Sequence, residues 1–320
     1  MATITIAIAG ITGTLGRLIT KHLLSHPDVH INGLYRNPSK LPLSLQTDPR
    51  LTLFQANASD VKVIRRALRK ADVAICCYLG DATTVMVDGQ KTLIDACIDE
   101  GVRRYIASDW SMDFRKLALG EHPPKDPMKH VQAYLEEKSD EITAVHVLNA
   151  CFLERPWVGL WDAQKECFRY WGTGDEKWEF TSYNNAAEYT AEVALDREAN
   201  GWLSFRGDHV SIRDIAADFK AVYDCEPKLQ RLGSLDDLFK LMHTTRDRDP
   251  SNFGAWLGLF YTYYSLNGQT ALPEPLDCSR YPNVQVDKVR DFFTKTPKRR
   301  LGKKSFFKSL MHTDVNNSAI

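Results

Sequence analysis

The stretch that decides the fold is Ile4-Thr5-Ile6-Ala7-Ile8-Ala9-Gly10-Ile11-Thr12-Gly13-Thr14-Leu15-Gly16. Its first six residues form a short apolar run rich in β-branched side chains, which is typical of a buried strand. From Thr14 to Ser25, leucine and isoleucine recur at helical spacing. A strand that enters a glycine-rich turn and then a helix predicts a unit that binds phosphate groups.

The three glycines of this turn have distinct physical roles. Gly10 permits a tight turn out of the strand, Gly13 lets the backbone approach a pyrophosphate, and Gly16 lets the helix pack closely on the strand. The free N–H groups and the positive end of the helix dipole attract phosphates. The spacing is G-x-x-G-x-x-G rather than G-x-G-x-x-G. We interpret it as a dinucleotide-binding turn, with a ligand-free glycine turn as the alternative.

The end of the second expected strand refines the choice of dinucleotide. An Asp or Glu there would accept hydrogen bonds from the 2′-hydroxyl of a ribose. The sequence instead has Arg36, followed closely by Lys40. A guanidinium and an ammonium suit a 2′-phosphate. The sequence therefore predicts NADP(H) rather than NAD(H), the alternative being a solvated surface arginine.

Strand-like and helix-like segments alternate through the first half of the chain. We expect strands over 4–9, 30–35, 51–54, 73–78, 104–107 and 143–148, and helices over 14–25, 60–69, 87–100 and 127–138. This alternation predicts an α/β fold with a Rossmann-type, doubly wound parallel sheet. After Cys151 come an aromatic segment and further helices, at 186–195, 212–223, 235–242 and 253–264. We expect these to form a smaller C-terminal α+β substrate domain.

The expected domains follow from this change of pattern. Residues 1–153 would form the NADP(H)-binding domain and residues 154–295 the substrate-binding domain. The segment 183–210 would pack back on the first domain. Residues 296–320 would form a basic, flexible tail, because seven basic residues and no acidic one lie between Lys295 and Lys308.

Composition excludes several classes of protein. The 320 residues carry 41 Lys and Arg against 41 Asp and Glu, so no overall basic bias points to nucleic acid or to a membrane surface. The seven cysteines lack the paired spacing of a zinc site. The longest apolar stretch, 253–272, is interrupted by glycines and polar residues. We expect a soluble, cytoplasmic protein without a metal, which binds a small molecule as a monomer or a homodimer.

Six segments in one order resemble a known family. GITGTLG, LYRNPSK, GVRRYIASDW, DPMKHVQAYLEE, HVLNACFLE and YWGTGDEKWEFT are similar to the NmrA-like and isoflavone reductase-like branch of the atypical short-chain dehydrogenases. The resemblance extends from Ile4 to about Phe293. It implies an NADP(H)-binding Rossmann domain, a smaller C-terminal substrate domain, and an active site between them.

The resemblance also implies site residues. The implied cofactor contacts are Gly10, Thr12, Gly13, Thr14, Leu15, Gly16, Arg36, Lys40, Asn57, Cys77, Tyr78, Leu79, Lys129, Cys151 and Phe152. Two positions depart from the family pattern. Ala56-Asn57 stands where a Gly-Asp pair is usual, and Asn185-Ala186-Ala187 replaces Asp-Ile-Gly or Asp-Ile-Ala. Neither change obviously removes cofactor binding, and both leave substrate specificity open.

Lys129 is the leading candidate for catalysis, with Ser108 as a second. The resemblance places Lys129 beside the nicotinamide ribose, where an ammonium can assist protonation of the substrate; a solvent-exposed helix lysine is the alternative. Tyr134 and Lys138 have the Tyr-x-x-x-Lys spacing of standard short-chain dehydrogenases, but the family match assigns the active-site lysine to Lys129. Four residues before Lys129 stands Lys125, so the usual catalytic tyrosine is missing.

Aromatic side chains near the expected active site are candidates for a substrate pocket. They are Tyr78, Trp110, Phe152, Trp157 and Trp161, and simple core packing is the alternative. The sequence thus predicts an NADPH-dependent reductase of a small aromatic or conjugated molecule. A nucleotide-sensing regulator without turnover stays open, as does a dehydratase, isomerase or cyclase that uses the same pocket.

Overall fold

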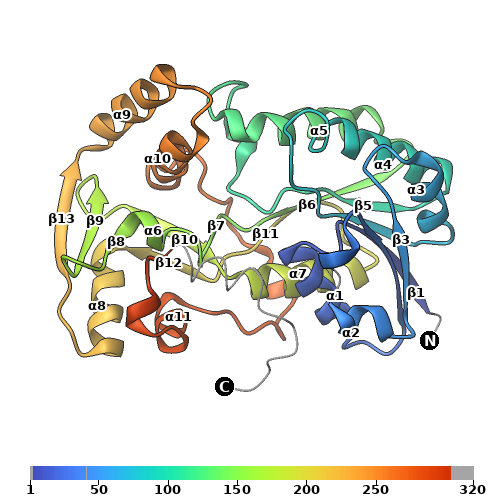
Figure 1. The fold of residues 1–320 in the computed structure, drawn as a ribbon, viewed down its shortest axis with the longest axis horizontal. Coiled ribbons are helices and arrows are strands. Elements are labelled where there is room, and N and C mark those ends of the chain that lie inside the picture. Colours follow the sequence, from blue (N-terminus) through green and yellow to red (C-terminus); the bar gives the residue numbers. More distant parts are fainter. Residues whose placement is uncertain (1–2, 41, 304–320) are drawn as a thin grey trace.

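Seven parallel strands form the central sheet of the computed structural model, which describes residues 3–40 and 42–303 (Figure 1). The strands are β1 (Ile4–Ala9), β2 (Val29–Tyr35), β3 (Leu51–Gln55), β4 (Val73–Cys76), β5 (Arg104–Ile106), β6 (Thr143–Leu148) and β11 (Gly201–Ser204). Their order is β11-β6-β5-β4-β1-β2-β3. The winding reverses at β1 and β4, so the predicted doubly wound sheet is confirmed and its switch point lies there.

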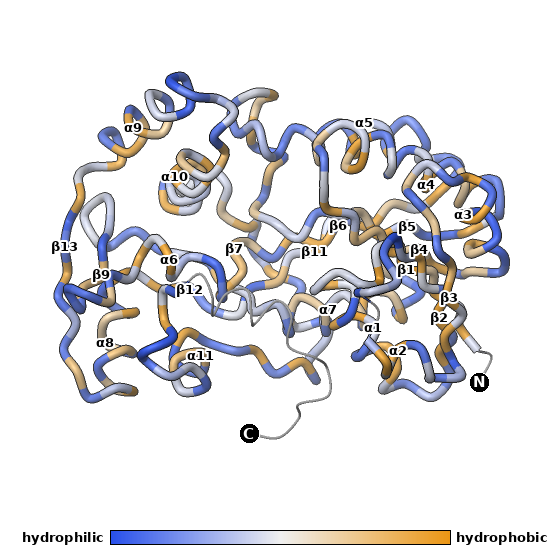
Figure 2. Tube along the Cα trace, viewed as in Figure 1, coloured by the Kyte–Doolittle hydropathy of each residue, from blue (hydrophilic) through white to orange (hydrophobic). Residues whose placement is uncertain are grey.

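The side chains of β1 alternate between two separate cores. Ile6 and Ile8 pack in the cluster on one face of the sheet. Ala7 and Ala9 pack in the cluster on the other face. Because successive strand residues point to opposite faces, a run that is apolar throughout must be covered on both sides. Figure 2 shows the hydrophobic stretches along the strands of this sheet.

Helices cover both faces of the sheet. One layer holds α1 (Thr14–Leu23), α2 (Leu43–Thr47) and α7 (Tyr183–Leu195), and the other holds α3 (Val61–Leu68), α4 (Asp88–Asp99) and α5 (Asp126–Glu137). Helix α7 packs against α1 although the two lie far apart in the sequence. Both α7 and β11 belong to the segment 183–210, and they pack on α1 and extend the central sheet, respectively.

A second region follows β6 and carries two small sheets. One has the order β12-β10-β7 and the other β13-β9-β8. The strands are β7 (Cys151–Phe152), β8 (Trp161–Asp162), β9 (Cys167–Trp171), β10 (Lys177–Thr181), β12 (Asp208–Ser211) and β13 (Lys228–Gly233). The helices are α6 (Trp157–Leu160), α8 (Ile212–Tyr223), α9 (Leu235–Arg248), α10 (Phe253–Leu266) and α11 (Val289–Lys295). Short 3₁₀ helices are η1 (Pro38–Lys40), η2 (Phe114–Lys116), η3 (Pro123–Lys125), η4 (Asp277–Arg280) and η5 (Lys298–Arg300).

Some element boundaries differ from those expected. The fourth strand ends at Cys76 rather than residue 78, and beyond it the Tyr78 carbonyl accepts a hydrogen bond from the Ser108 hydroxyl. Helix α9 continues beyond residue 242 to Arg248. Residues 296–303 of the expected tail pack on the second region, where Leu301 is buried. The rest of that tail, 304–320, lies outside the described residues.

Candidate cofactor-binding and active site

Backbone geometry at the glycine turn fits a close approach of a ligand. Gly10 has φ +88°, a conformation that L side chains rarely adopt. A Cβ at Gly10 would lie 2.8 Å from the Cys77 carbonyl oxygen, and one at Gly16 would lie 2.6 Å from the Gly10 carbonyl oxygen. Only glycine, which has no Cβ, fits at these two positions. The turn is also anchored to β2, since the N–H groups of Gly10 and Ile11 both donate to the Leu34 carbonyl.

Helix α1 directs its first turn into a groove of about 980 Å³. Gly13 is its N-cap and makes no side-chain cap, and the first turn holds no acidic residue. The groove is therefore open to the positive end of the helix dipole. Its lining includes ten predicted cofactor residues: Gly10, Thr12, Gly13, Thr14, Arg36, Lys40, Asn57, Cys77, Tyr78 and Leu79. Leu15 and Gly16 lie in the next part of α1, behind that surface.

Two cations flank one end of the groove. Arg36 follows β2 directly and Lys40 ends η1, and both side chains are exposed. Within residues 3–40 and 42–303, neither makes a salt bridge closer than 4.0 Å to a carboxylate. Asn57, which replaces the usual acidic residue after β3, lines the same end. An anion of two charges would be well placed between these groups.

The loops after β4 and β5 are tied together under the groove. The Ser108 hydroxyl donates to the Tyr78 carbonyl at 2.9 Å, and the Ser108 N–H donates to the Gln90 side chain at 3.2 Å. Burial raises the pKa of the Cys77 thiol and of the Tyr78 phenol well above their ordinary values. Both groups are thus protonated and uncharged, and Ser108 acts as a brace for the loop that holds them.

Two stacked aromatic rings lie in and beyond the segment that follows β6. The Phe152 ring stacks on Tyr183 at 3.8 Å between centroids, and Arg155 Nε donates to the Tyr183 hydroxyl at 2.8 Å. Burial raises the pKa of the Cys151 thiol to about 12, whereas the charges of Arg155 and Lys125 lower it. Burial also raises the pKa of Glu154 to about 7, although its carboxylate accepts from the Tyr183 N–H.

Lys129 lies in the first turns of α5 and is half-buried. Its Nζ donates to the carbonyl oxygens of Phe114 and Arg115, both at 3.4 Å. These long hydrogen bonds hold the ammonium against η2. Lys129 does not line the groove beside the glycine turn.

The three candidate tryptophans occupy packed cores. Trp110 is buried and its Nε1 donates to the Thr190 hydroxyl of α7 at 2.8 Å. Trp157 stacks on Phe292, and Trp161 packs against Phe168 and Phe219. None of the three lines the groove. Trp110 belongs to a core of the central sheet, whereas Trp157 and Trp161 belong to the core that the second region builds from its aromatic segment. Of the candidate pocket residues, the structure brings Tyr78 to the groove and stacks Phe152 on Tyr183.

The Tyr-x-x-x-Lys pair lies on the outer surface of α5. Tyr134 donates to Asp95 of α4 at 2.5 Å, and Lys138 donates to Glu141 at 2.9 Å. Neither lines the groove. Tyr134 thus joins α5 to α4, and Lys138 makes a local ion pair at the end of α5.

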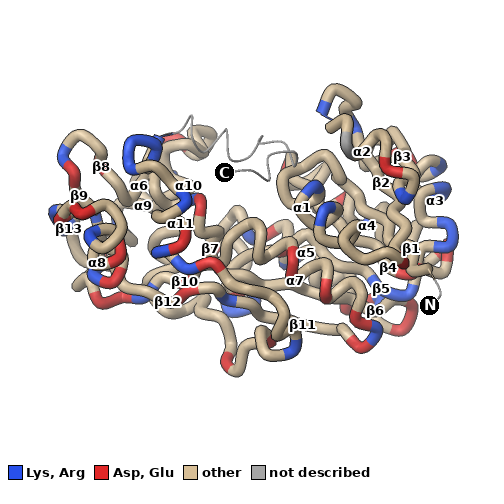
Figure 3. The backbone as a smooth tube through the Cα atoms, turned by 90° about the horizontal axis from the view of Figure 1, so that it is seen from below, with Lys and Arg blue, Asp and Glu red and all other residues tan. Residues whose placement is uncertain are grey.

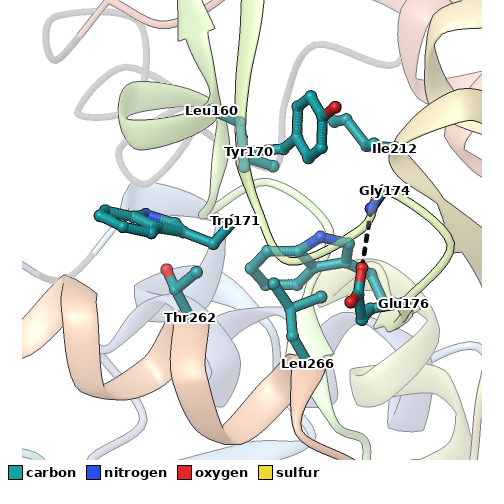
Figure 4. Close-up of a pocket in the computed structure, with 9 residues that line it drawn as sticks. Leu160, Tyr170, Trp171, Gly174, Glu176, Ile212, Thr262 and Leu266 are labelled. Carbon is teal, nitrogen blue, oxygen red and sulfur yellow. Dashed lines mark hydrogen bonds between the residues drawn. The ribbon is translucent and has the colours of Figure 1, made fainter. Parts of the chain in front are cut away.

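A much smaller cavity, of about 10 Å³, lies under α10 (Figure 4). Its walls are Leu160, Tyr170, Trp171, Gly174, Glu176, Trp178, Ile212, Thr262 and Leu266. Figure 4 shows the Glu176 carboxylate accepting from the Gly174 N–H, at 2.9 Å. The space holds about one water molecule, so it is too small for a substrate.

Sequence reasoning gave no role to two buried polar residues near the site. His122 precedes η3 and Lys125 is its last residue, and they are 0% and 3% exposed. A lysine or histidine next to prolines is typical of a surface loop, but here the rings of α10 pack against both side chains. The burial of Glu154 was not predicted either, because nothing in the sequence around a glutamate that follows a strand indicates that it is buried.

The charged residues, the helices and the possible metal ligands of the described residues give three further findings. Basic and acidic residues are interspersed along α8, as Figure 3 shows, whereas α3 carries basic residues only. Among the described residues, no helix combines the length and apolar character needed to cross a membrane. The same residues hold no group of three His, Cys, Asp or Glu side chains placed to bind a metal ion.

Comparisons with known proteins agree with this geometry. Residues 10–153 match the family of NAD(P)H-binding domains. No curated protein sequence matches the chain. Among solved structures, AtPrR2 with NADP⁺ and (+)pinoresinol superimposes with a TM-score of 0.77 at 19% identity, over 92% of this chain and 99% of that one.

Two further structures show the same fold over most of their length. An isoflavone reductase has a TM-score of 0.74 at 15% identity, over 92% of this chain and 99% of that one. A complex of leucoanthocyanidin reductase with NADPH from Vitis vinifera has a TM-score of 0.73 at 16% identity, over 91% and 98% of the two chains. The predicted resemblance to the isoflavone reductase-like proteins is confirmed in the fold, and the predicted nucleotide-binding domain is confirmed by the family match.

Proposed function

We propose that the protein is an NADPH-dependent reductase of a small aromatic or conjugated molecule. One observation supports the proposal: a single groove is lined by the glycine turn, by the uncapped N-terminus of α1, and by Arg36 and Lys40, neither of which forms a salt bridge with a described residue. The turn suits a pyrophosphate, and the two cations suit a 2′-phosphate. The solved structures with NADP⁺ or NADPH that share the fold support this assignment.

The bound dinucleotide would supply a hydride, and the residues of this chain would position it. Gly10 and Gly13 would admit the pyrophosphate, and Arg36 with Lys40 would hold the 2′-phosphate. Ser108 would keep the Tyr78 loop against the nicotinamide half. Because the neutral Cys77 and Tyr78 side chains bring no negative charge to this wall, they would leave the hydride donor undisturbed.

Lys129 and Ser108 are the residues proposed to assist the proton. Each now donates to a backbone carbonyl, Lys129 to Phe114 and Arg115 and Ser108 to Tyr78. The hydrogen bonds of Lys129 are the longer ones, so its ammonium is the easier group to release toward a substrate oxygen. Negative charge that develops on the substrate during hydride transfer would draw it there.

The cofactor assignment is tested by replacing Arg36 with alanine. We expect the variant to bind NADPH about 10- to 100-fold more weakly, because charge-assisted hydrogen bonds to the phosphate are lost, and to bind NADH as the wild type does. Titration of each nucleotide, followed by its fluorescence, measures both affinities. Arg36→Lys should restore part of the preference, and Arg69→Ala, which removes another largely exposed arginine, should keep it in full. Equal binding of the two nucleotides by the wild type would contradict the assignment.

A further inference from the structure

Lys125 is a buried cation without an anion. Its side chain is 3% exposed, and its Nζ lies 4.7 Å from the centre of the Tyr261 ring on α10. Within residues 3–40 and 42–303, no carboxylate lies within 4.0 Å of this ammonium. The nearest acidic residue in the sequence, Asp126, instead accepts from the Gly120 N–H at 3.0 and 3.1 Å. A buried charge is normally paired, so this one lacks an expected partner.

His122 lies beside Lys125 with both ring nitrogens unpartnered. It is fully buried, and the rings of Phe260, Tyr261 and Tyr264 surround it at 4.8 to 5.8 Å between centroids. Burial and the neighbouring Lys125 charge lower the pKa of His122 to about 3. The imidazole is therefore neutral, so it can offer one N–H donor and one acceptor but cannot balance the ammonium.

The segment that carries these two residues is held firmly in place. The Tyr264 hydroxyl donates to the Glu121 carbonyl at 3.1 Å, and Gln269 Nε2 donates to the Glu121 carboxylate at 2.7 Å. Lys125 itself ends η3 and its N–H donates to the His122 carbonyl at 2.7 Å. Among the described residues, neither ring nitrogen of His122 has a hydrogen-bond partner and no carboxylate pairs with Lys125. Because both features cost stability, the two side chains are placed for a ligand rather than for the fold.

The position in the fold is that of a substrate site. The charge of Lys125 lowers the pKa of the Cys151 thiol, and Cys151 begins β7, three residues after the carboxyl end of β6. Two non-glycine residues in the left-handed region, Trp110 with φ +28° and Ala150 with φ +54°, follow β5 and β6 at the same edge. Next to them, the Ser111 hydroxyl and the Asn149 amide are buried without a partner. Backbone strain and unsatisfied polar groups gather at functional sites, and ligands of open α/β sheets bind at this edge.

We propose that Lys125 and His122 bind the carboxylate of the substrate, which makes the substrate a small aromatic or conjugated carboxylic acid. The proposal rests on the reductase function above and names its substrate class. A carboxylic acid is ionised at neutral pH, so it can pair with a buried ammonium without any proton transfer, whereas a phenol is not. One carboxylate oxygen would accept from Lys125 and the other from the His122 N–H. The rings of α10 would exclude water from the pair.

The test compares acids with their esters. Benzoate, cinnamate and indole-3-acetate, each alongside its methyl ester, are titrated calorimetrically into the full-length protein saturated with NADPH. The wild type should bind at least one acid roughly 10- to 100-fold more tightly than its ester, because the ester lacks the charge. Lys125→Met should bind the acid and the ester alike, and Lys165→Met, at an exposed lysine, should keep the wild-type preference. Equal affinity for acid and ester in the wild type, or an unchanged preference in Lys125→Met, would overturn the proposal.

Thermal melting of the same proteins gives an independent readout. Removing an unpaired buried cation should raise the melting temperature of Lys125→Met, whereas loss of a structural ion pair would lower it. The bound acid should raise the melting temperature of the wild type and leave that of the variant unchanged. A variant that melts below the wild type would overturn the proposal. The two proposals can fail separately. If the carboxylate site is correct but the protein is not an NADPH-dependent reductase, the acid binds and NADPH does not.

Discussion

Replacing Gly10 by alanine should destabilise the protein by about 3 kcal/mol and lower its affinity for NADPH by roughly 100-fold. The left-handed φ of +88° strains any L side chain, and the new Cβ would lie 2.8 Å from the Cys77 carbonyl oxygen. Since that oxygen is backbone, relief requires β1 and the loop after β4 to move apart. The pyrophosphate-binding turn and the wall of Cys77 and Tyr78 would then lose their common geometry. Thermal melting and NADPH titration measure the two effects.

Gly13→Ala is the matched control for this prediction. Gly13 has φ −71°, and its Cβ would meet only the Gly10 carbonyl oxygen, at 3.3 Å. We expect stability to fall by less than about 1 kcal/mol, because alanine is merely a poorer N-cap than glycine. NADPH affinity should still fall roughly tenfold, because a methyl group would stand where the backbone meets the pyrophosphate. If both variants kept wild-type affinity, the turn would not be the cofactor site.

The second large effect is expected at Arg104, where alanine should lower stability by about 3 kcal/mol. This buried guanidinium on β5 donates to the carbonyl oxygens of Val193, Ala194 and Asp196 at the end of α7, at 3.2, 2.8 and 2.5 Å. Its loss would leave these carbonyls without partners and remove a cation from the negative end of the α7 dipole. Since α7 packs on α1, the helix that begins at the cofactor groove should loosen as well.

The adjacent Arg103 provides the control, because its side chain is exposed and only its backbone carbonyl takes part in the sheet. Arg103→Ala should change stability by less than about 0.5 kcal/mol. Hydrogen exchange of α7, measured for both variants, separates a local loosening from global unfolding. Equal melting temperatures for the two variants would show that Arg104 does not bind α7 to the sheet.

Local patterns explain how much of the fold was predictable. The strands and helices alternate within short stretches of sequence, and the conformation of the glycine turn depends only on neighbouring residues. Both could therefore be predicted from the sequence. Arg36 follows its strand without a gap, and its position at the groove was thus predictable as well. These features depend on residues that are close in the sequence, so a single sequence is enough to predict them.

Long-range packing explains what could not be predicted. The cation of Lys125 is buried only because α10, more than 120 residues later, packs over it. The candidate tryptophans Trp157 and Trp161 belong to a core that α11 completes from the far end of the chain. The role of Lys129 stays a prediction from the resemblance, and its Nζ donates to two carbonyl oxygens of η2. Helical spacing alone does not tell which of two lysines four residues apart, Lys125 or Lys129, faces a ligand.

Hydride transfer is the reaction proposed for this protein, and deuterium labelling tests it most directly. NADPH labelled at C4 of the nicotinamide, in each of its two diastereomers, is incubated with the full-length protein and a set of aromatic and conjugated acids. Mass spectrometry of the products should find one deuterium, from one diastereomer only, because a fixed groove presents a single face of the ring. Products that carry no deuterium from either diastereomer would contradict the claim and indicate non-redox chemistry. Tight cofactor binding with no product from any compound would contradict it as well, in favour of a nucleotide sensor.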